Sequence, residues 1–224
     1  MTGLVRLAFA AFFFFYFSYI GLMSPYASLY FSSRNFGAIE IAALMSMFQI
    51  TRILGPFAWG WLADIRRDRL GIMRMTSVMA CIIFSAIFYL ESYLPLLIWM
   101  FLLNTVISSL MPLGEAATVH ALYKNNDFDR RYGRLRLWGS IGFIAMVLFA
   151  GAWFERFGIE SFPYFGMVAL LIMTVLTTTL REPAMEATHH VEIKLGHVLK
   201  NTQVQWFMSA NFWMIFGHAA LYVF

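Results

Sequence analysis

The sequence is poor in charged residues and contains almost no cysteine. Only 12% of its 224 residues are charged, whereas 61% are hydrophobic and 18% are aromatic. This composition excludes an ordinary soluble domain, in which about a quarter of the residues are charged. Cys81 is the only cysteine, which excludes an intrachain disulfide and suggests no thiol metal site. The catalytic patterns His-Glu-x-x-His and Gly-x-Ser-x-Gly are also absent, so we expect neither an enzyme nor a cofactor.

Long hydrophobic runs take up most of the chain instead. A helix needs about 20 apolar residues to cross ~30 Å of hydrocarbon, and seven such runs lie between the charged clusters. The pattern predicts an all-α polytopic membrane protein. The first run is too long for a signal peptide, and the last ends with the chain, so we expect the chain to be truncated there. The predicted spans are Leu7–Phe31, Ile39–Leu62, Ile72–Leu90, Leu94–Tyr123, Leu137–Phe154, Phe162–Leu180 and Val204–Phe224.

The longest polar stretch of the chain lies between the sixth and seventh runs. We therefore expect three parts: a six-helix bundle over residues 1–180, a cytoplasmic linker over 181–203, and the first helix of a second, truncated bundle over 204–224. The histidines and acidic residues of the linker lack the spacing of metal ligands, so no metal site is expected there. They are Glu186, His189, His190, Glu192 and His197.

Basic residues lie almost entirely on one side of the predicted bundle. Thirteen of the sixteen Lys and Arg residues fall on that side, Arg34 and Arg156 fall on the other, and Arg52 lies inside a span. Because basic loops stay in the cytoplasm during insertion, this asymmetry predicts a cytoplasmic N terminus in a bacterial inner membrane. The same asymmetry explains the net charge of +4, because the excess basic residues set the topology and face the headgroups of the lipid bilayer. We therefore expect no nucleic acid to bind.

Two residues of opposite charge are predicted to lie near the middle of the bilayer. Arg52 is about 12 residues, or ~18 Å, from either end of its span, and Glu115 lies ~13 Å inside the fourth span. A charge at such depth costs at least ~2.5 to 3.5 kcal/mol. Burial favours the neutral form of Glu115 and a nearby Arg52 favours the charged form. We therefore interpret the pair as a site of proton coupling, with a purely structural ion pair as the alternative.

Several short segments carry a family resemblance. Residues 60–69 (GWLADIRRDR) resemble the signature of major facilitator transporters between the second and third spans, with Arg67 where the family has glycine. Residues 132–140 (YGRLRLWGS), 111–116 (MPLGEA) and 217–222 (GHAALY) are similar to the bacterial phenylpropionate permease branch, a relative of the lactose and nucleoside proton symporters. The resemblance covers essentially the whole chain.

This resemblance implies a fold and a function. The fold is a six-helix N-terminal bundle of two inverted three-helix repeats, followed by a seventh helix, with the remaining C-terminal helices as its missing partner. The function is proton-coupled uptake of a small organic solute, such as an aromatic carboxylate, by alternating access. A sugar or nucleoside proton symporter on the same scaffold, or a membrane scaffold fragment that does not transport, are the alternatives.

Polar and aromatic residues on the spans are candidates for the solute cavity and for a gate. Tyrosines recur every three or four residues along the first span, which fits either helix packing or a cavity wall; the resemblance, in which the first, fourth and seventh helices line the cavity, favours the wall. The cavity candidates are Tyr19, Tyr26, Gln49, Asn104, His218 and Tyr222. The signature segment implies a gate, with simple retention of positive charge as the alternative, formed by Gly60, Asp64, Arg66, Arg67 and Arg69.

Overall fold

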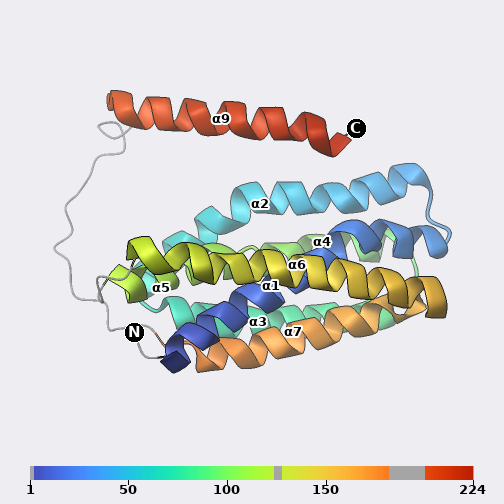
Figure 1. Ribbon diagram of the computed structural model, residues 1–224. Coiled ribbons are helices and arrows are strands. Elements are labelled where there is room, and N and C mark those ends of the chain that lie inside the picture. The colour runs from blue at the N-terminus through green and yellow to red at the C-terminus, as the bar shows by residue number, and fades with distance from the viewer. Residues whose placement is uncertain (1–2, 124–127, 182–199, 224) are drawn as a thin grey trace. The chain divides into compact units, whose positions relative to one another are not determined.

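The computed structural model describes residues 3–123, 128–181 and 200–223, of which residues 123, 128–130 and 215–223 are described by their backbone alone. All of the secondary structure in these residues is helical (Figure 1). The chain divides into two compact units, Met1–Ala184 and Met185–Phe224. The second unit holds α9 (Thr202–Val223), a helix over the run predicted as the seventh span.

The first unit is a bundle of long apolar helices. Among the described residues, six helical stretches are long and apolar enough to cross a membrane, and each contains most of one predicted span. The all-α polytopic fold expected from the hydrophobic runs is therefore confirmed. Its elements are α1 (Gly3–Ser33), α2 (Ala38–Arg66), α3 (Arg69–Ser85), η1 (Ala86–Phe88), α4 (Tyr93–Ile107), α5 (Leu110–Tyr123), α6 (Phe128–Phe157), η2 (Ile159–Ser161) and α7 (Phe162–Thr179).

The fourth span differs from its prediction because it is two helices rather than one. The break between α4 and α5 falls at Ser108 and Ser109. Pro112 has no N–H to donate to the carbonyl of Ser108, so the helical ladder is interrupted at this point. The Ser109 hydroxyl donates to Thr76 on α3 over 2.8 Å and to the carbonyl of Val106 over 2.8 Å. The Ser109 side chain therefore links the break to α3.

The fifth span also differs, because α6 begins at Phe128 and not at Leu137. The prediction placed the boundary where the charged residues end. A helix can continue beyond the apolar run, however, when one of its faces packs on the protein, and Leu135 in this stretch is only 6% exposed. Arg136 therefore lies on a membrane-spanning helix and not in a loop.

Successive spans run in opposite directions, so the basic clusters gather at one end of the bundle (Figure 1). This end, the basic end, holds the start of α1, the connection between α2 and α3, and the start of α6. Arg74, near the start of α3, donates to the carbonyls of Thr177 and Leu180 at the end of α7, both over 3.3 Å. One arginine thus satisfies carbonyls left free by the end of a neighbouring helix. The cytoplasmic location of the basic end stays a prediction.

Helix α1 packs most closely against α6. Ser18 of α1 donates its hydroxyl to the carbonyl of Gly142 over 3.1 Å. Nearer the other end of the bundle, the Tyr26 hydroxyl donates to the carbonyl of Val147 over 2.7 Å. The lack of a side chain at Gly142 allows this approach, because an added Cβ would overlap the carbonyl oxygen of Phe14. Small residues permit close backbone contact in membrane helix pairs in this way.

We expect Gly142→Ala to lower the stability of the protein by ~1 to 3 kcal/mol, because overpacking forces the backbone to move. The added Cβ would lie 2.8 Å from the carbonyl carbon of Phe14, which cannot rotate away as a side chain can. Thermal unfolding in detergent measures the effect. Gly133→Ala is the matched control on the same helix, since a Cβ there meets no atom within 4 Å. An equal loss in both variants would contradict the packing argument.

Candidate functional site

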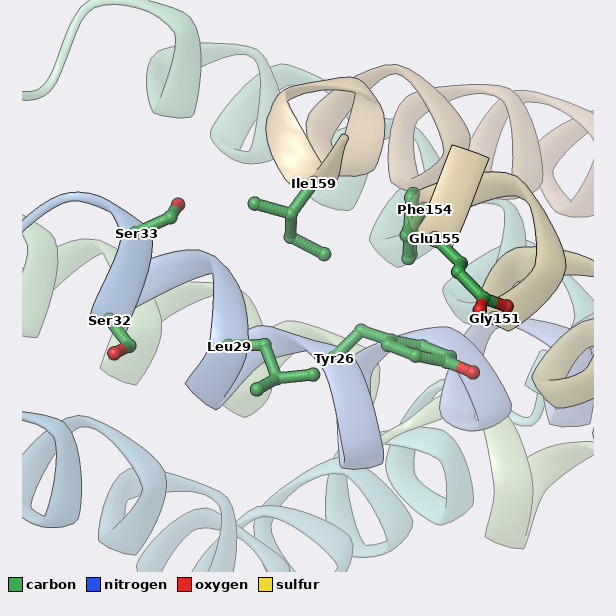
Figure 2. A pocket seen from close by; sticks show the side chains of 8 residues that line it. All are labelled: Tyr26, Leu29, Ser32, Ser33, Gly151, Phe154, Glu155 and Ile159. Atoms are coloured by element: carbon green, nitrogen blue, oxygen red, sulfur yellow. The ribbon is translucent and has the colours of Figure 1, made fainter. Parts of the chain in front are cut away.

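Two cavities open into the first unit. The first lies at the end opposite the basic end, between α1 and α6, and has a volume of about 550 Å³. Figure 2 shows Tyr26 and Glu155 on the same side of this cavity, with Ser32 and Ser33 farther along α1. The Tyr26 hydroxyl is already engaged with α6. Glu155 is the only charged residue that lines this cavity, so the cavity offers few groups that could bind a solute. The lining is Tyr26, Leu29, Ser32, Ser33, Gly151, Phe154, Glu155 and Ile159.

The second cavity, the central pocket, has a volume of about 470 Å³ and is lined by five helices. Two arginines, two amides and several aromatic rings contribute to its wall, and none of its lining residues is acidic. Its chemistry makes it the candidate functional site. The lining residues are Tyr16, Phe17, Ile20 and Ser24 of α1; Met45, Phe48, Gln49, Thr51 and Arg52 of α2; Asn104 and Ile107 of α4; Ser108 at the break; Met111 of α5; and Arg136 of α6.

Arg52 enters the central pocket from the middle of α2. It is the central residue of that helix (Ala38–Arg66), and it shares a helical face with Gln49 and Met45, three and seven residues earlier. No ion pair joins Arg52 to any residue that the structure describes. Asn104 lines the pocket from α4 and is 4% exposed, and its amide donates to the carbonyl of Met100 over 2.8 Å. The amide oxygen of Asn104 remains as an acceptor in the wall.

Arg136 enters the same pocket from α6 and lies against four side chains. Its Nε lies 3.2 Å from Oε1 of Glu115 on α5, and each of the two side chains is 36% exposed. Its guanidinium group lies 4.3 Å from the ring centre of Phe17 and 5.8 Å from that of Phe13. Tyr132, one turn earlier on α6, lies close to both Glu115 and Arg136. This combination fixes the plane of the guanidinium group.

The partner of Glu115 is therefore Arg136 and not Arg52, the partner predicted from the sequence. The prediction placed Arg136 among the loop arginines because it follows Arg130, Arg131 and Arg134. Since α6 begins at Phe128, Arg136 lies ~12 Å inside the helix, and Glu115 lies about as far from the end of α5. The two residues thus share a level. The Arg136-Leu-Trp-Gly139 segment, which opens the apolar run, was the signal available in the sequence.

Arg52 and the ion pair nevertheless belong to one electrostatic cluster. Tyr16, which is 8% exposed, lines the central pocket between them and lies within electrostatic reach of Arg52, Glu115 and Arg136. The cluster contains two positive side chains and one negative side chain. Its net charge is therefore positive, and the excess charge faces the pocket.

The structure separates the predicted cavity residues. Gln49 and Asn104 lie with Arg52 in the central pocket, while Tyr26 lines the first cavity. Tyr19 lines neither of them; it is fully buried, its ring centre is 6.5 Å from that of Phe84, and its hydroxyl has no hydrogen-bond partner among the described residues. The predicted stripe followed the tyrosines, whereas the face of α1 that lines the pocket runs along Tyr16, Phe17, Ile20 and Ser24.

Two groups of predicted residues fall outside this comparison. The side chains of His218 and Tyr222 on α9 lie outside the described residues, as do the linker histidines. Within the described part of the chain, no group of His, Cys, Asp and Glu side chains is placed to hold a metal ion.

The predicted gate at the basic end is a tight turn between α2 and α3. Arg67 adopts a left-handed conformation (φ 52°) at the end of α2, so the turn forms without the glycine of the family signature, at a cost of roughly 1–2 kcal/mol. Asp68 caps α3, because its carboxylate accepts from the N–H of Gly71 over 2.7 Å. Asp64, Arg66, Arg67 and Asp68 are exposed.

Comparisons with known proteins place the chain among transporters. Residues 6–224 match the model of the MFS_1 like family. The chain is 27% identical to the maltose permease of Geobacillus stearothermophilus, over 81% of this chain and 46% of the permease. It is 23% identical to the uncharacterized transporter YwbF of Bacillus subtilis (strain 168), over 89% of this chain and 50% of that protein.

A solved structure agrees with the fold. The crystal structure of the nucleoside transporter NupG superposes on 95% of this chain and 52% of its own length, with a TM-score of 0.77 and 17% sequence identity. The chain spans about half the length of each of these relatives.

Proposed function

Because the chain belongs to the MFS_1 like family, a family of the major facilitator superfamily, we propose that it supplies one half of the solute pathway of a secondary transporter. It is an integral membrane protein with six described spans. In this proposal the N terminus is cytoplasmic, a second bundle that begins with α9 supplies the opposite wall, and the solute is a small organic anion such as an aromatic carboxylate.

The positive charge of the central pocket carries the proposal for an anion. Arg52 and Arg136 line the pocket, none of its lining residues is acidic, and Glu115 neutralises only one of the two arginines. A charge within the membrane is costly until it is paired, so an anionic solute completes the site. An arginine fork also matches the geometry of a carboxylate.

The size and the apolar part of the pocket fit a one-ring solute. Its volume of about 470 Å³ falls within the ~300 to 1,000 Å³ that is typical of small-molecule sites. Tyr16, Phe17 and Phe48 contribute aromatic rings, which pack on another ring in offset or edge-on geometry. A compound with one aromatic ring and one carboxylate therefore matches both the charge and the wall of the pocket.

Competition for Arg136 would couple the solute to a proton. A solute carboxylate that binds Arg136 displaces Glu115 from its ion-pair partner, and a carboxyl without a counter-charge in a membrane favours its neutral form. Glu115 then takes up a proton, and the solute and the proton cross together without net charge. In this scheme Arg52 binds solute, and the turn with Gly60, Asp64, Arg66, Arg67 and Arg69 acts as the gate at the basic end.

A sugar or a nucleoside remains the second candidate solute. The relatives include proteins named maltose permease and nucleoside transporter. Gln49, Asn104 and Ser24 in the pocket would bind hydroxyl groups, and the Arg136–Glu115 pair would offer a donor and an acceptor side by side.

Uptake into membrane vesicles that carry the protein together with its second bundle tests the proposal. With an inward proton gradient, labelled 3-phenylpropionate should accumulate, a protonophore should abolish the accumulation, and unlabelled aromatic carboxylates should compete with the label. Glu115→Gln should retain downhill uptake but lose accumulation. Accumulation that survives the protonophore would rule out proton coupling, and competition by maltose or uridine in place of carboxylates would favour the second candidate.

A further inference from the structure

We infer that Gly139 and Phe17 are positioning residues that hold the guanidinium group of Arg136 in its place in the central pocket; this inference rests on the proposed role of Arg136 in binding an anion. Arg136 and Gly139 lie three residues apart on α6 and therefore share a face of the helix. Phe17 comes from α1 and reaches both of them.

The Phe17 ring fills the space that a side chain at position 139 would need. A Cβ added to Gly139 would lie 2.6 Å from Cδ2 of Phe17, 3.1 Å from its Cε2 and 3.2 Å from Nη1 of Arg136. The same ring lies 4.3 Å below the guanidinium group. Even a methyl group at position 139 must therefore push the ring off the guanidinium group or push the guanidinium group off Glu115.

This geometry distinguishes Gly139 from two other glycines between α1 and α6, Gly142 and Gly21. At Gly142 and Gly21 an added Cβ would meet the backbone of the opposite helix: Phe14 for Gly142, and the carbonyl oxygen of Phe143, 2.7 Å away, for Gly21. Those glycines set the distance between the helices. At Gly139 the atoms met are side-chain atoms of the site itself, so this glycine sets the orientation of Arg136.

The orientation matters because the Arg136 fork has two tasks. Before the solute binds, its Nε contacts Glu115, and the solute carboxylate that displaces Glu115 must then be bound by the same fork. A guanidinium group that loses its stacking surface samples more orientations, and bidentate recognition then loses its geometric advantage. Gly139→Ala should therefore reduce the preference for a carboxylate more than it reduces binding of a neutral analogue.

A double-mutant cycle between Gly139→Ala and Phe17→Leu tests the inference on the purified chain in lipid nanodiscs. The readout is the affinity ratio of 3-phenylpropionate to its neutral analogue 3-phenyl-1-propanol. Phe17→Leu loses the stacking contact and should lower the ratio about 3-fold, and Gly139→Ala should lower it about 10-fold. The double variant should fall only about 3-fold, because leucine makes room for the added methyl group, whereas independent effects would multiply to about 30-fold.

Two glycine variants provide the controls. Gly133→Ala meets no atom within 4 Å and should change nothing. Gly21→Ala should lower the melting temperature without changing the affinity ratio. If Gly139→Ala likewise lowers only the melting temperature, or if the double variant shows the multiplied loss, Gly139 is a packing residue and the inference is wrong.

The melting temperatures of the same four proteins keep the inference separate from the proposed function. If the wild type shows no preference for the carboxylate, the proposed function fails, and the ligand-free cycle then decides the inference. If the melting temperature of the double variant is close to that of the Phe17→Leu variant, the contact between Phe17 and position 139 is supported. If the decreases in melting temperature of the two single variants add up in the double variant, the inference is wrong.

Discussion

An Arg136→Ala variant should lose about 100-fold in affinity for 3-phenylpropionate and should melt at a lower temperature than the wild type. The substitution removes the contact with Glu115 at 3.2 Å and the contact with the Phe17 ring at 4.3 Å. A hydrogen bond to a charged group contributes ~1.5 to 3 kcal/mol, which corresponds to roughly 10- to 150-fold in affinity. Because the variant loses the contact with the solute carboxylate and also the orientation of the solute, we expect an effect near the upper end of this range.

The loss of stability has a separate cause. Without Arg136, Glu115 stays at membrane depth with no counter-charge. Removing one partner of a fully buried pair costs ~3 to 5 kcal/mol. Because both side chains are about one third exposed, water screens part of this cost, and we expect ~2 kcal/mol.

Arg134→Ala is the matched control for Arg136→Ala. Arg134 lies two residues earlier on α6, so its side chain points to the other side of the helix; it is exposed and does not line the central pocket. Calorimetric titration in nanodiscs and thermal unfolding give the two readouts. Binding by Arg136→Ala within about 3-fold of the wild type, or an equal loss in Arg134→Ala, would contradict the assignment of Arg136 to the site.

An Arg52→Gln variant should lose about 30-fold or more in affinity for 3-phenylpropionate and bind 3-phenyl-1-propanol nearly as well as the wild type. Arg52 has no ion-pair partner among the described residues, so in this account its charge serves the solute alone. Glutamine keeps a polar group on a shorter side chain but removes the charge, at an expected cost of ~2 kcal/mol or more for a charged hydrogen bond. Arg52→Lys should lose less, because it keeps a point charge without the fork.

Stability separates the roles of the two arginines. Arg52 has no ion-pair partner among the described residues, and at its predicted depth in the membrane such a charge costs free energy in the absence of solute. Arg52→Gln should therefore melt at or above the temperature of the wild type, as expected where function and stability conflict. A melting temperature well below that of the wild type would show that Arg52 supports the fold and would weaken its assignment to the solute.

The fold could be predicted from the sequence because it depends on the length and composition of apolar runs, which are local properties. The break in the fourth span was less visible. Pro112 marks the interrupted backbone bond, but the hydroxyl contact from Ser109 to Thr76 that stabilises it joins residues 33 positions apart. Likewise, the turn at Arg67 forms because Asp68 caps the next helix, which compensates for the missing glycine.

The site could be predicted only in part, because its residues meet across five helices. Arg52, Gln49 and Asn104 were found because polar side chains in apolar spans are conspicuous. Arg136 was not, because a basic residue at the start of a span looks like a loop residue. The structure divides the tyrosine stripe, because Tyr16 lines the central pocket whereas Tyr19 packs against Phe84. Residue type alone does not distinguish a ring that lines a pocket from one that packs.

The central claim is that the pocket with Arg52 and Arg136 binds an organic anion. The most direct test is the affinity of the wild-type protein in nanodiscs for 3-phenylpropionate and 3-phenyl-1-propanol, two compounds that share the ring and chain but differ in charge. The account predicts that the carboxylate binds at least about 10-fold more tightly. Equal affinity for both compounds, or binding of maltose or uridine with neither compound bound, would contradict it.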